Sequence, residues 1–252
     1  MKPSEKILNT WRKFNDFPLE TLSKVWMHSI DQGGVQRGVS LMKEHRRKYG
    51  LSGNCFDLAI WLLDEFRKDG IEAYPIGHDL NTEDAHVAVV AKDELGDRYL
   101  CDLGDQWIMP ILIDENNKDF TVERQSGFFP AADVQVQPSG KYVEILYHRP
   151  NGKVSKQLYD ITPIQAETFY RAAHKSQSLI RETPLVECRI PYKNEVAHWE
   201  FDDWEITLST TDGLYKHSCE DYVEVIHRVL GFDRELLEAI LLNKGRRDGN
   251  ED

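Results

Sequence analysis

The sequence lacks any apolar run long enough to cross a membrane. Its longest strictly apolar stretch is six residues, Leu58 to Leu63, whereas a spanning helix needs about 20. The first residues, MKPSEKILNTWRKF, contain no apolar segment of the kind found in a secretory signal. Basic residues are also scarce: 31 Lys and Arg stand against 43 Asp and Glu, a net charge of −12. Such a charge argues against general nucleic-acid binding. We therefore expect a cytoplasmic protein with neither nucleic acid nor membrane as a partner.

Cysteine pairs are missing as well. The four cysteines lie at positions 55, 101, 188 and 219, so no C-x-x-C pair exists, and zinc ribbons and thioredoxin-type redox motifs are excluded. The sequence also contains no G-x-G-x-x-G, Walker A, H-E-x-x-H or G-x-S-x-G motif. We expect four reduced thiols, no metal site and no bound cofactor, and the question becomes whether one thiol is a nucleophile.

Apolar material is plentiful, and its periodicity changes along the chain. Hydrophobic residues make up 40% of the sequence and aromatic residues 10%, which is enough for a sizeable core. Helical spacing dominates the first seventy residues, β-rich runs follow, and the last third is mixed. The expected helices are 4–15, 18–30, 34–49, 55–69, 163–178, 219–230 and 233–243; the expected strands are 71–77, 85–91, 98–103, 107–113, 119–124, 141–148, 154–160 and several short ones between 186 and 218. This order predicts an α+β fold.

Cys55 is the first candidate nucleophile. It opens the helix expected at 55–69, with Asn54 as a natural N-cap and Asp57 in the first turn. A cysteine at a helix N-terminus lies at the positive end of the helix dipole, which favours the thiolate. The alternative is that Cys55 is simply part of the apolar stripe of that helix, because free cysteine is a common core residue.

His86 and Asp102 complete a possible catalytic set. Their two β-runs resemble a hairpin, and the two positions are symmetric about residue 94 in the expected turn. Within a residue or two of register, the side chains would face each other across antiparallel strands. The alternative is a buried His–Asp pair with only a structural role. Together with Cys55, however, the pair would supply nucleophile, base and orienting acid.

These segments resemble the arylamine N-acetyltransferase family. Residues 51–57, Leu-Ser-Gly-Asn-Cys-Phe-Asp, resemble its Arg-Gly-Gly-X-Cys-X-Glu motif; residues 85–89, Ala-His-Val-Ala-Val, resemble its histidine strand; residues 100–104, Leu-Cys-Asp-Leu-Gly, resemble its Asp-Val-Gly strand. Weaker similarity extends through 176–191 and 221–232. The resemblance implies a Cys55-His86-Asp102 triad on a papain-like core, with acetyl-CoA or another acyl-CoA as co-substrate and a small-molecule amine as acceptor.

The implied architecture has an N-terminal helical bundle carrying the nucleophile at 1–70, a central antiparallel β-barrel or sheet carrying His and Asp at 71–160, and a C-terminal α/β lid at 161–243. Residues 244–252 are polar and are expected to form a flexible tail.

Four departures from the family pattern leave other functions open. Leu51 and Ser52 replace Arg and Gly, Asp57 replaces Glu, and Asp105 stands where an aromatic residue is usual. Transglutaminase-like and peptidase-like amidohydrolases share the same triad and fold, and an inactive family member is a third possibility. The sequence identifies no CoA-binding residue. The basic run 43–48 lies just upstream of Cys55 and could meet CoA phosphates, or it could be a solvated helix end.

Overall fold

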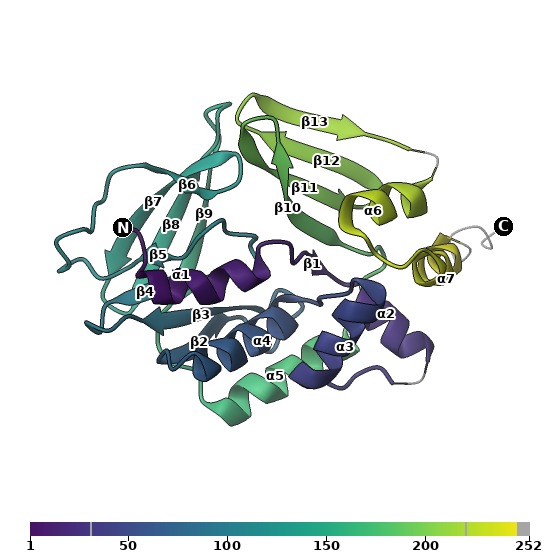
Figure 1. Ribbon diagram of the computed structural model, residues 1–252, viewed down its shortest axis with the longest axis horizontal. Helices are drawn as coiled ribbons and strands as arrows, with labels where there is room; N and C mark the ends of the chain where they lie inside the picture. Colours follow the sequence, from purple (N-terminus) through teal and green to yellow (C-terminus); the bar gives the residue numbers. More distant parts are fainter. Residues whose placement is uncertain (31, 220, 246–252) are drawn as a thin grey trace.

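A computed structural model of the chain describes residues 1–30, 32–219 and 221–245. Its helices are α1 (Glu5–Trp11), the short 3-10 helix η1 (Arg12–Phe14), α2 (Leu22–Ser29), α3 (Val39–Tyr49), α4 (Cys55–Lys68), α5 (Ala166–Ser178), α6 (Tyr222–Leu230) and α7 (Arg234–Gly245). The fold is α+β, as the sequence predicted, with N-terminal helices followed by antiparallel sheets (Figure 1).

Thirteen strands form three sheets within the described residues. The strands are β1 (Leu19–Glu20), β2 (Ala73–His78), β3 (His86–Lys92), β4 (Arg98–Cys101), β5 (Ile111–Leu112), β6 (Gln125–Phe129), β7 (Ala132–Ser139), β8 (Tyr142–His148), β9 (Val154–Asp160), β10 (Val186–Tyr192), β11 (Glu195–Asp202), β12 (Glu205–Thr210) and β13 (Gly213–His217). Their orders are β2-β3-β4-β5, β6-β7-β8-β9 and β1-β10-β11-β12-β13. In the part of the chain that the structure describes, all three sheets are open, and no strand pairing closes one into the barrel that the sequence left open.

Several expected elements need correction. The segment 119–124 forms no strand, and the next strand starts at Gln125; the expected strand 107–113 is reduced to β5. Strand β7 was missed although its residues alternate regularly, with Ala132, Val134 and Val136 buried and the polar residues between them half-buried or exposed. The expected helix 18–30 starts only at Leu22, because Leu19 and Glu20 pair with β10 as an edge strand. The tail expected at 244–252 falls largely outside the described residues, and α7 continues to Gly245.

Two apolar cores hold the molecule together. The larger combines α1, α4 and α5 with the sheets β2–β5 and β6–β9. The smaller combines β10–β12 with α6 and α7, and it also contains Leu22 and Leu51 from the N-terminal region. Figure 1 shows the β10–β13 sheet and its two helices on one side of the molecule, with α2–α5 below it and the β6–β9 sheet beside it. Burial of this apolar surface is the main source of stability.

The loop before α4 lies between these cores. Leu51 is fully buried in the smaller core, whereas Phe56, two residues into α4, is fully buried in the larger one. Residues 52–55 are therefore held from both sides, which places Cys55 on a rigid element.

Candidate active site

Cys55 is the first residue of α4, directly after the N-cap Asn54, as the sequence predicted. The Asn54 side chain accepts hydrogen bonds from the backbone N–H groups of Phe56 (3.0 Å) and Asp57 (3.1 Å). The Asp57 carboxylate in turn accepts from the Asn54 backbone N–H at 3.1 Å, completing a capping box. Cys55 follows the cap directly and is half-buried. Its thiol therefore lies at the positive end of a 14-residue helix.

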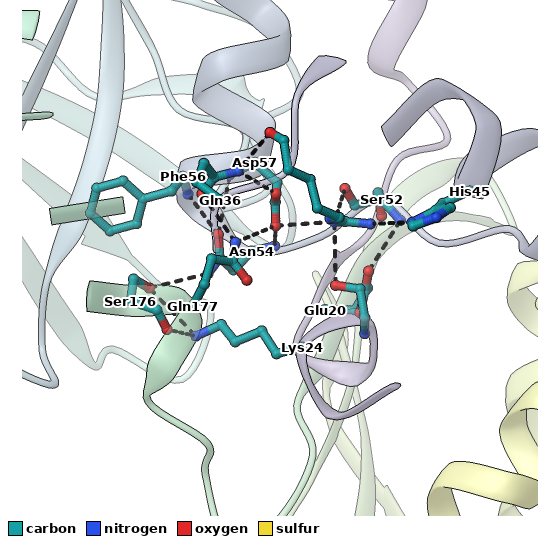
Figure 2. Close-up of polar contacts among 12 residues, drawn as sticks. Glu20, Lys24, Gln36, His45, Ser52, Asn54, Phe56, Asp57, Ser176 and Gln177 are labelled. Atoms are coloured by element: carbon teal, nitrogen blue, oxygen red, sulfur yellow. Dashed lines mark hydrogen bonds and ion pairs between the residues drawn. The ribbon is translucent and has the colours of Figure 1, made fainter. Parts of the chain in front are cut away.

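A buried ion pair supports this loop from behind. The Arg37 guanidinium lies 3.1 Å from the Asp57 carboxylate, and both side chains are at most 2% exposed. Arg37 also donates to the Ser52 carbonyl at 3.2 Å. The side-chain amides of Gln36 (2.7 Å) and Gln177 (3.0 Å) donate to the same carboxylate. Figure 2 shows these amides around Asp57, next to Asn54.

The role of Arg37 as the buried partner of Asp57 was not predicted from the sequence. The family motif carries its arginine at the position of Leu51, but here Leu51 packs into the smaller core and the guanidinium comes from Arg37, 14 residues earlier in the chain. No spacing rule links Arg37 to the motif. The only available signal was that the acidic position of the motif, Asp57, requires a buried cationic partner.

Gly53 leaves the space that the Arg37–Asp57 ion pair occupies beside the loop before α4. A Cβ atom there would lie 2.2 Å from the Asp57 carboxylate and 2.4 Å from the Arg37 guanidinium. Its φ of +114° is also a conformation that residues with a side chain rarely adopt. The glycine of the motif is therefore required by both space and backbone geometry.

His86 and Asp102 are brought together. His86 is the first residue of β3, and its Nε2 lies 2.6 Å from Oδ2 of Asp102. Asp102 follows the last residue of β4 and is fully buried. The register of β3 and β4 pairs Val89 with Cys101, so it differs by two residues from the symmetry expected about residue 94. A shift of two keeps both side chains on one face, which is why the pair still forms.

The remaining contacts of Asp102 orient it. The Tyr159 hydroxyl from β9 donates to Oδ2 at 2.9 Å, and the Asp105 backbone N–H donates to Oδ1 at 2.9 Å. Tyr159 is itself buried. A carboxylate with both oxygens hydrogen-bonded can hold an imidazole in one orientation.

This environment favours the charged form of His86. Burial lowers its pKa, but the Asp102 carboxylate and the Cys55 side chain raise it, and the net pKa lies well above the usual value of 6.5. Because the pKa is raised in the folded protein, the His86–Asp102 pair contributes stability fully below pH 6.5 and loses it as the pH rises through the higher value. Desolvation raises the pKa of the Cys101, Cys188 and Cys219 thiols.

Gly104 is the point where the three residues converge. A Cβ atom added there would lie 2.9 Å from Cβ of Cys55, 3.1 Å from Cε1 of His86 and 3.3 Å from Oδ1 of Asp102. The structure thus brings together all three residues that the sequence singled out.

Replacement of Gly104 by alanine is expected to separate these side chains. An added methyl group must displace Cys55 or His86, and misplacement by about 1 Å can cost about 100-fold in rate. We expect at least that loss in the rate of Cys55 alkylation or acylation, with a destabilisation of about 1–3 kcal/mol from overpacking. Gly38→Ala is the control, because no atom lies within 4 Å of its added Cβ; equal rates in both variants would contradict the proposed convergence.

Cys55, His86 and Gly104 line a cavity of about 720 Å³, within the range typical of small-molecule sites. Its other walls include Lys24 and the segment between Ser176 and Leu185. The basic run 43–48 does not line it: Lys43 pairs with Glu65 (2.6 Å) and Arg46 with Asp16 (3.1 Å). This run is the C-terminal part of α3, so the solvated-helix interpretation fits its position and the phosphate-contact interpretation has no support.

The described residues form neither a membrane-spanning helix nor a cluster of metal ligands. No helix there is long and apolar enough to cross a membrane. Across the same residues, no three His, Cys, Asp or Glu side chains gather closely enough to bind a metal ion.

The chain resembles known proteins in its fold and not in its sequence. No protein-family model matches the sequence, and no curated protein matches it. Among solved structures, the arylamine N-acetyltransferase of Mycobacterium marinum in complex with CoA superposes with a TM-score of 0.69 at 10% identity, covering 94% of this chain and 92% of the other. That of Nocardia farcinica gives 0.72 at 13% identity, covering 92% and 84%.

A third match, the NAT3 arylamine N-acetyltransferase of Bacillus cereus, has a TM-score of 0.63 at 13% identity and covers 92% of both chains; it is described as having a Cys-His-Glu catalytic triad. The chain therefore has the arylamine N-acetyltransferase fold over nearly its whole length.

Proposed function

We propose that the protein is a cysteine acyltransferase that moves an acyl group from acyl-CoA to an amine through a thioester on Cys55. The observation that carries the proposal is the His86–Asp102 hydrogen bond of 2.6 Å beside a cysteine that opens a helix. These residues match the nucleophile, base and orienting acid of thiol enzymes.

Acylation follows from the arrangement of His86. Because Asp102 engages Nε2, Nδ1 is the nitrogen available to take the Cys55 proton. The thiolate attacks the acyl carbonyl, a new C–S bond forms, and the bond between the acyl carbon and the CoA sulfur breaks. The proton on His86 passes to the departing CoA thiolate.

Deacylation runs through the same nitrogen. The neutral amine attacks the thioester, its surplus proton goes to His86 and then to the Cys55 sulfur, and the amide leaves. The negative charge on the carbonyl oxygen needs donors at both steps. Asn54 occupies the N–H groups of Phe56 and Asp57, and the Asn54 N–H binds Asp57. In the described part of the chain, the Cys55 N–H has no such partner and can serve as one oxyanion donor.

A second candidate function keeps the triad and changes the donor. A transglutaminase-like or peptidase-like amidohydrolase would use the same thioester but release ammonia or a peptide amine. The position of the basic run 43–48 favours it, because that run does not reach the cavity to meet CoA phosphates. Support for acyl-CoA comes from the fold and from the Mycobacterium marinum protein, which was solved with CoA.

Incubation with acetyl-CoA, followed by mass spectrometry, separates these functions. We expect one acetyl group on Cys55, discharged when an amine is added, with Cys55→Ser unlabelled and Cys219→Ser labelled like the wild type. Ammonia release from a glutamine peptide without an acetyl adduct would replace acyl transfer by amidohydrolysis. Failure of iodoacetamide to modify Cys55 rapidly at pH 6 would instead indicate an inactive site.

A further inference from the structure

Asp105 is a second carboxylate at the reaction centre, and the proposed mechanism does not use it. It lines the same cavity as Cys55 and His86, and it is half-buried. Its backbone N–H already orients Asp102. Asp105 also directly follows Gly104, where the three proposed catalytic side chains meet.

Neighbouring donors hold this carboxylate in place through one oxygen. The Tyr147 hydroxyl (2.5 Å) and the Trp107 indole N–H (3.1 Å) both donate to Oδ2 of Asp105. Both partners are buried. Oδ1 has no hydrogen bond among the described residues, so it is the oxygen left for a ligand.

The cavity around Asp105 offers an aromatic ring few aromatic partners. Within the described chain, no Phe, Tyr or Trp lines it, and the imidazole of His86 is its one aromatic side chain. Its lining carboxylates are Glu83, Asp105, Glu182 and Glu187, against the cations Lys24 and Arg181 and the His86 imidazolium.

Lys24 and Arg181 are already engaged, and so is one of the carboxylates, because Glu187 lies 3.5 Å from Nε2 of His198. The Lys24 ammonium donates to the Ser176 carbonyl at 2.8 Å, and Arg181 lies 3.2 Å from Asp202. The negative side chains are thus in the majority on the cavity wall, and such a wall attracts positively charged ligands.

We infer that the acceptor is an aliphatic amine that carries a second positive charge, such as a diamine, and that Asp105 binds this second ammonium while the neutral amino group attacks the Cys55 thioester. The inference rests on the proposed acyltransferase function and names its acceptor class. It assigns Asp105 a role in selecting the acceptor.

The charge of Asp105 is available near neutral pH. Burial and the neighbouring Asp102 raise its pKa to about 6, while the Tyr147 hydroxyl, the His86 imidazolium and the Trp107 N–H oppose the rise. Asp105 is therefore ionised above pH 6, and the preference for a dication should weaken as the pH falls through that value.

The test compares three acceptors on a preloaded enzyme. p-Nitrophenyl acetate is used to acetylate Cys55, so that loading does not depend on CoA recognition. Discharge is then followed with 1,4-diaminobutane, propylamine and aniline at pH 8. We expect kcat/KM for the diamine to exceed that for propylamine by about tenfold or more, which is typical for a hydrogen bond to a charged group. Aniline, which is neutral at this pH, should be the slowest.

Asp105→Asn keeps the shape and an acceptor oxygen for Tyr147, and it is expected to reduce the ratio between diamine and propylamine to about one. Asp133→Asn, at an exposed position of β7, is the matched control and should keep the wild-type ratio. An unchanged ratio in Asp105→Asn, or aniline as the fastest acceptor, would overturn the inference while leaving acyl transfer intact.

Calorimetric titration of the unmodified protein with 1,4-diaminobutane separates the two proposals. If Cys55 accepts no acyl group but the diamine binds in an Asp105-dependent way, the acyltransferase proposal fails and the cation site remains. If Cys55 is acylated and no diamine binding or discharge is found, the acceptor class is wrong.

Discussion

Replacing His86 with glutamine is expected to lower the rate of Cys55 acylation by about 10²- to 10⁴-fold, the range that a positioned general base contributes. Glutamine can still donate a hydrogen bond to Asp102, so the buried carboxylate keeps a partner. The imidazole that takes and returns the proton is lost. The residual rate in this variant should increase steeply with pH, because only thiolate generated by bulk base can then react.

His78→Gln is the matched control for this experiment. His78 pairs with His86 across β2 and β3, and the two ring centroids lie 5.7 Å apart. It bonds to Asp79 at 2.8 Å and does not line the cavity. We expect its rate to stay close to that of the wild type. A similar loss in both histidine variants would mean that damage to the sheet, rather than loss of the base, explains the effect.

Non-additivity provides a stricter criterion. In a set of residues that act as one unit, removing a second member costs little after the first. The double variant Cys55→Ala, His86→Gln should therefore turn over p-nitrophenyl acetate no more slowly than Cys55→Ala alone. A further drop of a hundredfold would show that the two residues act separately.

Replacing Arg37 with methionine is expected to reduce the free energy of unfolding by about 3–5 kcal/mol, because it leaves the Asp57 carboxylate buried without its cation. Asp57 is completely buried, so water cannot substitute for the lost partner. Urea denaturation measures the change as a lower midpoint at an unchanged slope. The same variant should also slow Cys55 modification, because Arg37 binds the Ser52 carbonyl of the loop before α4.

A double-mutant cycle distinguishes the ion pair from general packing loss. Asp57→Asn, combined with Arg37→Met, removes both charges and should cost less than the sum of the single changes. The exposed pair Lys156–Glu144, at 2.8 Å, provides the comparison: Lys156→Met should cost about 1 kcal/mol or less. A comparably small cost in Arg37→Met would show that the buried pair does not hold the loop.

Local sequence signals placed Cys55 at a helix start because its environment is local. Asn54 and Asp57 lie within three residues of Cys55, and the capping box depends only on backbone geometry at a helix start. The pairing of His86 with Asp102 was also predictable, because a hairpin joins residues close in sequence and a register shift of two preserves the face.

Contacts between distant segments could not be predicted in this way. Arg37 reaches Asp57 across a loop, Gln177 reaches it from 120 residues further along the chain, and Tyr159 reaches Asp102 from another sheet. Each of these contacts depends on how whole elements pack, and no short spacing encodes that packing. The same applies to the basic run 43–48, for which the sequence left both a phosphate contact and a solvated helix end open, and which α3 directs to Glu65 and Asp16.

The low content of basic residues, the scattered cysteines and the short apolar runs determined, from the sequence by itself, which classes of protein to set aside. The same sequence identified Cys55, His86 and Asp102 as candidates and predicted the α+β class. Only the tertiary structure decided that a net charge of −12 includes a cavity wall rich in carboxylates next to Cys55. The physical reason is that net charge is a sum over the whole chain, whereas the field at a reaction centre depends on which side chains the packing places there.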